Sequence, residues 1–254
     1  MPCPTVRDIC RLLDSLAPLA TQCAWDNSGL LVGDPDRPVR TAALALDITP
    51  AAVEAAHDAG AELLVSHHPV IFHPLKRMDP RDPAYLLARY DIAALCLHTP
   101  LDKASGGVND ALAAALGFEN AVPFAAEGDA AMLRTADVAP VDAPALAARV
   151  ANALHTTVRL ADAGRTIRRV ALVGGAGADF LPEAAGAGID ALITGDAGHH
   201  DFLDAKQLGV TLIAAGHYET EQPVIAALAR KLEAAFDLRV ICLPQTSPVT
   251  FLSE

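Results

Sequence analysis

Short apolar runs of strand length alternate along this chain with alanine-rich stretches whose apolar residues recur at helical spacing. Residues 41–46, 63–65 and 92–97 are runs of strand length, whereas the apolar positions of residues 6–16 fall on one face of a helix. Strands that alternate with helices form sheets covered by helices. The sequence therefore predicts an α/β fold with largely parallel or mixed sheets.

Local signals place helices between these strands. Thr49 followed by Pro50 predicts a helix that continues to Ala59, because proline is favoured in the first helical turn. Asn109 is expected to cap a further helix over residues 110–116.

The second half of the chain repeats this order of elements. We expect strands at residues 170–173, 191–194 and 211–215 and helices at residues 181–187 and 224–236. His98 and Asp102 of the first half then correspond to His217 and Glu221 of the second. This repetition predicts an internal duplication, with one α/β half in residues 1–126 and the other in residues 127–254. Residues 127–166, rich in Ala, Pro and Asp, are interpreted as the join.

The chain is acidic, with 19 Lys and Arg residues against 31 Asp and Glu residues and a formal net charge of −12. Neutralising nucleic-acid phosphates needs clustered basic residues, so nucleic acid is not expected as a partner. The first residues lack the apolar core of a signal peptide, and no apolar run is long enough to span a membrane. We therefore expect a cytoplasmic protein with no membrane partner. The expected partner is a small-molecule substrate.

The five cysteines are widely spaced without a CxxC pair, which favours reduced thiols. Cys96 and Cys242 lie within apolar runs and are expected to be buried packing residues.

Histidines and carboxylates gather where the predicted strands end. His67 and His68 follow one strand, and the pairs His98 with Asp102 and His217 with Glu221 follow two others. Imidazole and carboxylate together suit Zn, Mn, Fe or Ni, and strand-end residues can converge although they are far apart in sequence. The sequence therefore predicts one metal site.

Five side chains are more ligands than one open catalytic zinc requires, so two divalent metal ions are the better fit. The expected ligands are His67, His68, Asp102, His217 and Glu221. The backbone must bend after the first strand, since adjacent residues on a straight strand face opposite ways. His98 is expected to orient Asp102 or a bound water by a hydrogen bond.

Prolines near the two later motifs influence their expected backbone. Because Pro100 interrupts the first pair and Pro223 follows the second, both pairs are predicted to lie in strand-end loops and not on helices. The bend and the loops together would let two related motifs face one shared site.

Other motifs have two interpretations. His57, His73 and His155 are interpreted as ordinary surface or core histidines. His199 and His200 are either ligands or part of a mobile loop beside the site. The glycine-rich residues 173–178 could cradle phosphate but lack a complete phosphate-binding motif, so a tight turn is expected. The loop around Trp25 either lines the pocket or packs as a loop.

The combination of motifs resembles a known family. The motifs are Trp25-Asp26-Asn27-Ser28-Gly29-Leu30, Val65-Ser66-His67-His68-Pro69, His98-Thr99-Pro100-Leu101-Asp102, Thr194-Gly195-Asp196 and Gly216-His217 with Thr220-Glu221. In this order, and nearly from end to end, the chain is similar to the Nif-three-like dinuclear metal-centre family, whose members are named GTP cyclohydrolase I type 2 homologues.

The resemblance implies two interlocked α/β domains, a toroidal homohexamer and two divalent metals per subunit facing an inner cavity. Its ligands correspond here to His67, His68, Asp102, His217 and Glu221, the same set that spacing indicates. Relatives often carry a histidine where Leu203 stands in this chain. The family name implies opening of the guanine imidazole ring of GTP by water, with release of formate.

Three functions are compatible with such a site. The first is a dinuclear metal-dependent hydrolase acting on a small, nucleotide-like molecule. The alternative from another class is a non-catalytic metal-binding ring that delivers metal or serves as a scaffold. The third is a metallophosphoesterase, which the same two-metal arrangement permits.

Overall fold

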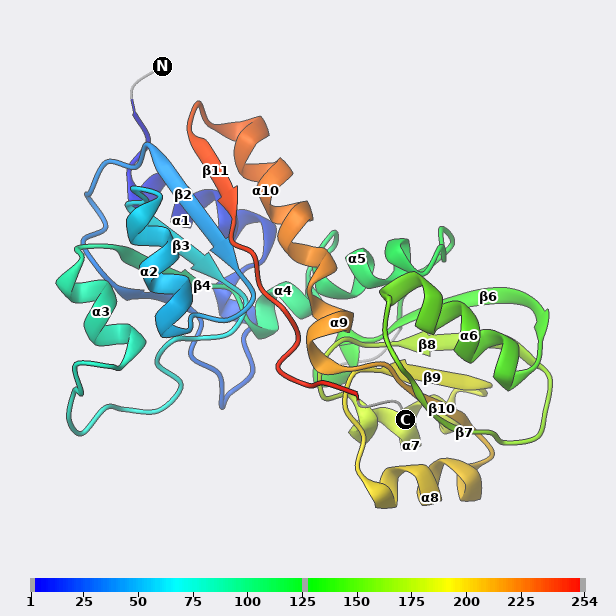
Figure 1. The fold of residues 1–254 in the computed structure, drawn as a ribbon. Helices are drawn as coiled ribbons and strands as arrows, with labels where there is room; N and C mark the ends of the chain where they lie inside the picture. Colours follow the sequence, from blue (N-terminus) through cyan, green and yellow to red (C-terminus); the bar gives the residue numbers. More distant parts are fainter. Residues whose placement is uncertain (1–2, 125–127, 252–254) are drawn as a thin grey trace. The chain divides into compact units, whose positions relative to one another are not determined.

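Two mixed sheets flanked by helices organise the chain in the computed structural model, which describes residues 3–124 and 128–251 (Figure 1). One unit holds the residues up to Ser105 together with Ile225–Gln245, and the other holds Gly106–Val224 and the residues after Gln245. The predicted α/β class with mixed sheets is confirmed.

The sheet of the first unit has five strands within the described residues, in the order β1-β4-β3-β2-β11. Its strands are β1 (Gly29–Val32), β2 (Thr41–Ala45), β3 (Leu63–Ser66), β4 (Ala93–Cys96) and β11 (Arg239–Cys242). Only the β1–β4 pair among them is antiparallel. In Figure 1 the red strand β11 lies beside the blue strand β2 although the two come from opposite ends of the chain.

The helices of this part of the chain are α1 (Val6–Leu16), η1 (Leu19–Thr21), α2 (Pro50–Asp58), α3 (Pro83–Arg89), α4 (Thr99–Lys103) and α10 (Pro223–Ala235). Thr5 starts α1 through a capping box with Asp8, and Val6, Ile9 and Leu13 form its buried face. Every residue of β2, β3 and β4 is buried, so both faces of the sheet centre are covered.

The sheet of the second unit has six strands within the described residues, in the order β5-β6-β8-β9-β10-β7. They are β5 (Val122–Pro123), β6 (Arg134–Val141), β7 (Arg159–Ala161), β8 (Ile167–Leu172), β9 (Ala191–Thr194) and β10 (Thr211–Ala214). The strands β8, β9 and β10 are parallel, and the outer pairs are antiparallel.

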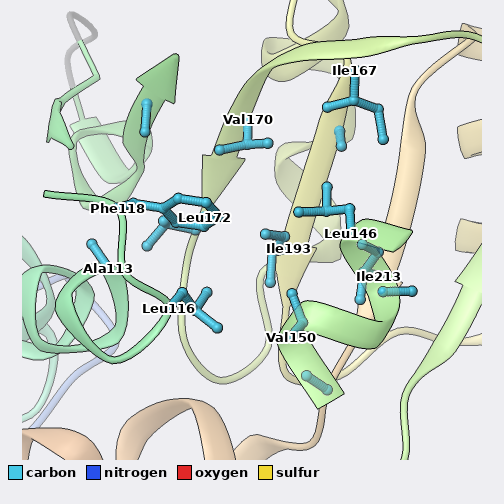
Figure 2. Close-up of a cluster of buried hydrophobic side chains, with 14 of the residues drawn as sticks. Ala113, Leu116, Phe118, Leu146, Val150, Ile167, Val170, Leu172, Ile193 and Ile213 are labelled. Atoms are coloured by element: carbon cyan, nitrogen blue, oxygen red, sulfur yellow. The ribbon is translucent and has the colours of Figure 1, made fainter. Parts of the chain in front are cut away.

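The helical elements of the second unit are α5 (Val108–Ala115), η2 (Gly128–Met132), α6 (Ala143–Leu154), η3 (Ala178–Phe180), α7 (Leu181–Gly186), α8 (His199–Leu208) and α9 (His217–Glu221). Its core packs α5 and α6 against the sheet, as Figure 2 shows for Leu146 and Val150 beside Ile193 and Ile213. Each such aliphatic side chain stabilises the fold by roughly 1.5–3 kcal/mol when it leaves water.

The expected join over residues 127–166 is wrong, because this segment contains β6, α6 and β7. Its loop-forming residues lie where helices and strands tolerate them. Asp142 caps α6 by accepting from Ala145 N, and Pro144 lies in the first turn. Pro140 lies within an irregularity in the pairing of β6 with β8, between the paired residues Asp137 and Val141.

The expected boundary between residues 126 and 127 lies outside the described residues. The compact units also differ from an end-to-end division, because residues 225–245 return to the first unit, where β11 extends its sheet beside β2. Both units carry three adjacent parallel strands, β2-β3-β4 and β8-β9-β10, which is the arrangement that a duplication would leave. The duplication itself stays a prediction.

Two smaller expectations also need correction. Asn109 does not cap α5, since Gly107 holds that position and Asn109 is buried inside the helix. Cys96 is buried as expected, whereas Cys242 is exposed because β11 is the edge strand of its sheet. In the part of the chain that the structure describes, no helix is both long and apolar enough to cross a membrane.

Candidate metal centre

In the first unit, polar residues follow three parallel strands at one edge of the sheet. Ala45 of β2 is opposite Ser66 of β3, and Ser66 is opposite Cys96 of β4. The residues that come after these strands therefore leave the sheet at the same edge. In parallel α/β sheets this is the edge where ligands bind.

His67 and His68 are brought together by a bend at the end of β3. The strand ends at Ser66, whose hydroxyl donates to the His68 carbonyl at 2.7 Å. The two ring centroids are 4.8 Å apart, with His67 fully buried and His68 half-buried. This confirms the bend that the sequence requires if both residues are to serve one site.

The three imidazoles at this edge of the first sheet are each held by a hydrogen bond through the Nδ1 atom. His67 Nδ1 lies 3.1 Å from Leu97 O, His68 Nδ1 lies 2.8 Å from Asp47 Oδ1, and His98 Nδ1 lies 2.9 Å from Asp26 Oδ1. Carbonyl and carboxylate oxygens only accept hydrogen bonds, so each Nδ1 carries the proton. In a neutral ring Nε2 is then the lone-pair nitrogen, which is the form that binds metal.

His67, His68 and His98 form a group that could hold a metal ion, with their ligand atoms within 4.8 Å of one another. His98 was expected only to orient Asp102 or a water. Its ring instead contacts both other imidazoles, with centroids 5.3 Å from His67 and 5.4 Å from His68. Its carbonyl accepts from Asp102 N at 3.3 Å, so it also helps to place Asp102 through the backbone.

Asp26 is the residue that fixes His98. Its carboxylate accepts from Thr99 N at 3.1 Å, from the Thr99 hydroxyl at 2.5 Å and from the Ser28 hydroxyl at 2.9 Å. Burial alone would raise the pKa of Asp26, but the hydrogen bonds from His98 and Thr99 hold that pKa well below its ordinary value. Asp26 is therefore a carboxylate, as the orientation of His98 requires.

Asp102 is buried on α4, with its Oδ1 atom 3.7 Å from His67 Nε2. The expectation of a loop between His98 and Asp102 is wrong, because α4 begins at Thr99 and contains Asp102. Pro100 lies in the first turn of this helix, where its missing N–H is not needed.

The second unit places polar residues at the equivalent edge of its own sheet. Leu172 of β8 is opposite Ile193 of β9, and Thr194 of β9 is opposite Ala214 of β10. The glycine-rich turn follows β8, Asp196 follows β9 and His217 follows β10.

His217 is held as the first-unit histidines are. Its Nδ1 atom lies 2.7 Å from Asp196 Oδ2, and its Nε2 atom lies 3.3 Å from Glu221 Oε2. The two residues begin and end α9, so the predicted loop is wrong here too, and they form an i,i+4 pair on one helical turn. Pro223 does not prevent this, because it begins the next helix.

Glycine at position 175 makes room for Glu221, which is buried. Gly175 has a φ of +64°, and a Cβ atom there would overlap Glu221 Oε1. Gly174 N donates to Asn109 Oδ1 at 2.7 Å, and Gly175 N donates to Thr220 Oγ1 at 3.1 Å. Both amides already donate to side chains of the same unit, which supports the tight-turn interpretation over a phosphate cradle.

The remaining histidines lie elsewhere. His199 and His200 are exposed and begin α8, so the expected loop there is wrong. No potential metal-ligand group among the described residues includes them. His57 stacks on Tyr90 with centroids 4.1 Å apart, and His155 ends α6 in the left-handed conformation.

Sequence reasoning did not predict which residues orient the imidazoles, although Asp26 and Asp196 lie in the motifs that carry the family resemblance. Asp47, Asp26 and Asp196 each accept from the Nδ1 atom of a different histidine. Asp47 and Asp196 were detectable in principle, because each stands two residues after a buried strand, where parallel strands direct their next side chains to one edge. Asp26 had no comparable signal, since it comes from a loop of the first unit.

The donor atoms fit divalent transition metals. Neutral imidazoles with an anchored Nδ1 and buried carboxylates offer nitrogen and oxygen ligands, the combination that Zn, Mn, Fe and Ni accept. The chain therefore contains possible metal-ligand clusters built from the residues that the sequence singled out.

Comparisons with known proteins find similar sequences and structures along nearly the whole chain. The profile of the Duf34/NIF3 (NGG1p interacting factor 3) family matches residues 4–248. A Clostridium perfringens protein named GTP cyclohydrolase 1 type 2 homolog is 29% identical, with 91% of this chain and 92% of that protein covered. A Streptomyces coelicolor protein of the same name is 33% identical, with 93% and 90% covered. The crystal structure of Staphylococcus aureus protein SA1388 superposes with a TM-score of 0.91 at 25% identity, covering 99% of this chain and all of that one.

Proposed function

This chain belongs to the Duf34/NIF3 family, and from that premise we propose that it is a dinuclear metal-dependent hydrolase of a small, nucleotide-like molecule. The proposed metal ligands are His67, His68 and Asp102 of the first unit with His217 and Glu221 of the second. The name that these relatives carry, GTP cyclohydrolase 1 type 2 homolog, supports GTP as the first substrate to test.

One observation carries the proposal. Each of the histidines at the two strand edges has its Nδ1 atom bound to a carboxylate or carbonyl oxygen. A histidine that only packs or caps needs no fixed tautomer, whereas a ligand needs Nε2 presented as a lone pair in one direction. Repetition of the arrangement in both units supports a common metal-binding role.

The chain's own groups would divide the work as follows. The imidazoles supply neutral ligands, and the buried carboxylates of Asp102 and Glu221 balance the positive charge of the cations. Asp26, Asp47 and Asp196 keep the rings oriented. Two bound divalent cations would supply a water nucleophile at neutral pH and polarise a substrate oxygen.

We further propose that the protein acts in the cytoplasm as a homohexamer. Six chains of 26.4 kDa give a particle of about 158 kDa. Light scattering on the eluate of a size-exclusion column would measure this mass directly. A dimer or monomer at micromolar concentration would contradict the hexamer without affecting the metal ligands.

The decisive experiment measures metal content per chain by elemental analysis and formate release from GTP on the same samples. We expect two ions per wild-type chain, with losses in both Asp102→Ala and Glu221→Ala. The control is His57→Ala, which removes an exposed imidazole that stacks on Tyr90 and should leave metal content unchanged.

The outcomes separate the alternatives. Formate produced only by metal-loaded protein supports the hydrolase. Two ions with no turnover of GTP, other nucleotides or phosphate esters would exclude the hydrolase and leave a metal-delivery or scaffold protein. Loss of metal in Asp102→Ala but not in Glu221→Ala would contradict a centre that uses ligands from both units.

A further inference from the structure

The single tryptophan of this chain is unusually exposed. Trp25 keeps 55% of its surface accessible, and Phe72 nearby keeps 39%. The two ring centroids are 6.1 Å apart and their planes are inclined by 40°. Aromatic residues make up only 4% of this chain, so two exposed rings in contact form a distinct feature of its surface.

Both rings are held by the backbone that carries them. Asp26, next to Trp25, is bound to Thr99 and His98. Asn27 Nδ2 donates to Ile71 O at 2.5 Å, which joins the Trp25 loop to the segment that carries Phe72. We call Trp25 and Phe72 together the aromatic platform. Because its two loops are connected to each other, a ligand would meet rings that are already in place.

The aromatic platform adjoins the imidazoles of the candidate metal centre. The centroid of His98 lies 5.7 Å from that of Trp25 and 6.2 Å from that of Phe72, with interplanar angles of 74° and 75°. His98 in turn belongs to the group with His67 and His68. The platform thus extends the site by an apolar, aromatic surface on the first unit alone.

An exposed indole beside candidate metal ligands is well suited to bind a flat ring by its face. Aromatic faces prefer offset stacking with another ring, and the interaction tolerates different bases because every base has a π-face. Aliphatic ligands would gain less from two such rings, because they have no π-face to stack. A protein partner would need roughly 800 Å² of surface on this chain, more than two side chains provide.

We propose that Trp25 and Phe72 form a stacking subsite for the planar nitrogen heterocycle of the substrate, with His98 at its edge. This assignment rests on the proposed function, because it takes the bound ring to be part of the molecule that is hydrolysed. It makes Trp25 and Phe72 specificity-determining residues for ring-containing substrates and gives them no part in metal binding.

The single tryptophan makes the test direct, because the intrinsic tryptophan fluorescence of the whole protein comes from Trp25. Metal-loaded protein is titrated with guanosine, adenosine, GTP and ribose 5-phosphate. We expect the three ring-containing probes to quench the emission saturably and ribose 5-phosphate to have no effect. Phe72→Ala should weaken guanosine binding about ten-fold, and Phe72→Tyr should restore it.

The control variant is Leu75→Ala, which shortens an exposed apolar side chain close to Phe72 in sequence and should bind guanosine as wild type does. Metal content is measured for every variant, since a stacking role leaves it unchanged. Light scattering of Trp25→Ala shows whether the platform is instead an interface between copies of this chain.

Several results would overturn the inference. These are equal quenching by ribose 5-phosphate, no quenching by any ring, equal weakening by Leu75→Ala, or a smaller particle for Trp25→Ala. Failure of the proposed function gives a different result. Protein that binds no metal or shows no turnover, but is still quenched only by ring-containing probes, contradicts the hydrolase and retains the aromatic platform. Loss of quenching with metal and turnover intact would remove the platform alone.

Discussion

Gly175 illustrates how one missing side chain shapes the site. Its φ of +64° disfavours any other residue, and a Cβ atom would also overlap the Glu221 carboxylate. Gly188 has a similar φ of +70° with nothing within 4 Å of the added Cβ position. The two glycines therefore separate backbone strain from steric conflict with a candidate ligand.

We predict that Gly175→Ala lowers the free energy of unfolding by at least about 2 kcal/mol, whereas Gly188→Ala lowers it by about 1 kcal/mol. Only Gly175→Ala should also weaken metal binding, because Glu221 must move. Urea unfolding of the metal-free proteins and a metal titration of both variants measure the two effects. Equal metal affinity in the two variants would show that Glu221 is not a ligand.

Asp26 accepts hydrogen bonds from several groups at once, and its removal should therefore strongly destabilise the fold. We predict that Asp26→Ala lowers the free energy of unfolding by roughly 2–4 kcal/mol, because Thr99, Ser28 and His98 lose a shared carboxylate. Asp36→Ala is the control, since Asp36 pairs with Arg7 in water and its loss should change little. Chemical unfolding measures both, and similar losses would contradict an anchoring role for Asp26.

At the scale of elements, the capping box of α1 gives a pH-dependent prediction. The Asp8 carboxylate accepts from Thr5 N at 2.9 Å and from the Thr5 hydroxyl at 2.7 Å, and these bonds hold the pKa of Asp8 below its ordinary value. A lowered folded-state pKa stabilises the fold above the unfolded-state pKa near 4, and this stabilisation is lost as the pH falls through the folded-state pKa.

We therefore expect Asp8→Asn to be less stable than wild type at pH 6, with the difference shrinking below pH 4. Thr5→Ala should lower the free energy of unfolding by about 1 kcal/mol at pH 6, because α1 loses its cap. Urea midpoints measured at several pH values compare the three proteins. A difference between Asp8→Asn and wild type that stayed constant down to pH 3 would contradict this assignment.

Most elements could be predicted because their buried residues form local apolar patterns in the sequence. The bounds of α1 and β9 agree with the sequence predictions, since the first has a clean apolar face and the second is a short apolar run between polar residues. The segment with β6 and α6 was missed because β6 is buried only from Arg134 to Ala136 and its remaining residues are mostly exposed. Half-exposed strands carry little hydrophobic signal.

The candidate ligands could be named from sequence, but their local geometry could not. Prolines suggested loops after His98 and before α10, yet α4 and α9 are helices of a single turn that place Asp102 and Glu221. Such short helices depend on tertiary packing and have no periodicity to detect. Among the Nδ1 partners, Asp26 was hidden because it lies in a loop 72 residues from His98, whereas Asp47 and Asp196 each follow a buried strand and carried that signal.

At the scale of the whole molecule, bound metal should raise the free energy of unfolding. A ligand that binds only the folded state at 100 times its dissociation constant stabilises that state by about 2.7 kcal/mol. We predict that chelation lowers the melting temperature of wild type and that adding metal back restores it. Asp102→Ala should not respond to chelator, whereas His57→Ala should respond as wild type does. An identical response in Asp102→Ala would place the stabilising ion elsewhere.

The return of β11 to the first sheet has a consequence during synthesis on the ribosome. β2 is buried throughout, and one of its hydrogen-bonding edges is satisfied only by residues 239–242, which are translated after the whole second unit. A nascent chain that has just completed residue 224 therefore carries an apolar strand with an open edge, the type of edge that pairs with other chains. We expect early termination in this window to leave a chain prone to aggregation, because the strand that pairs with this edge of β2 is complete only when residue 242 has been translated.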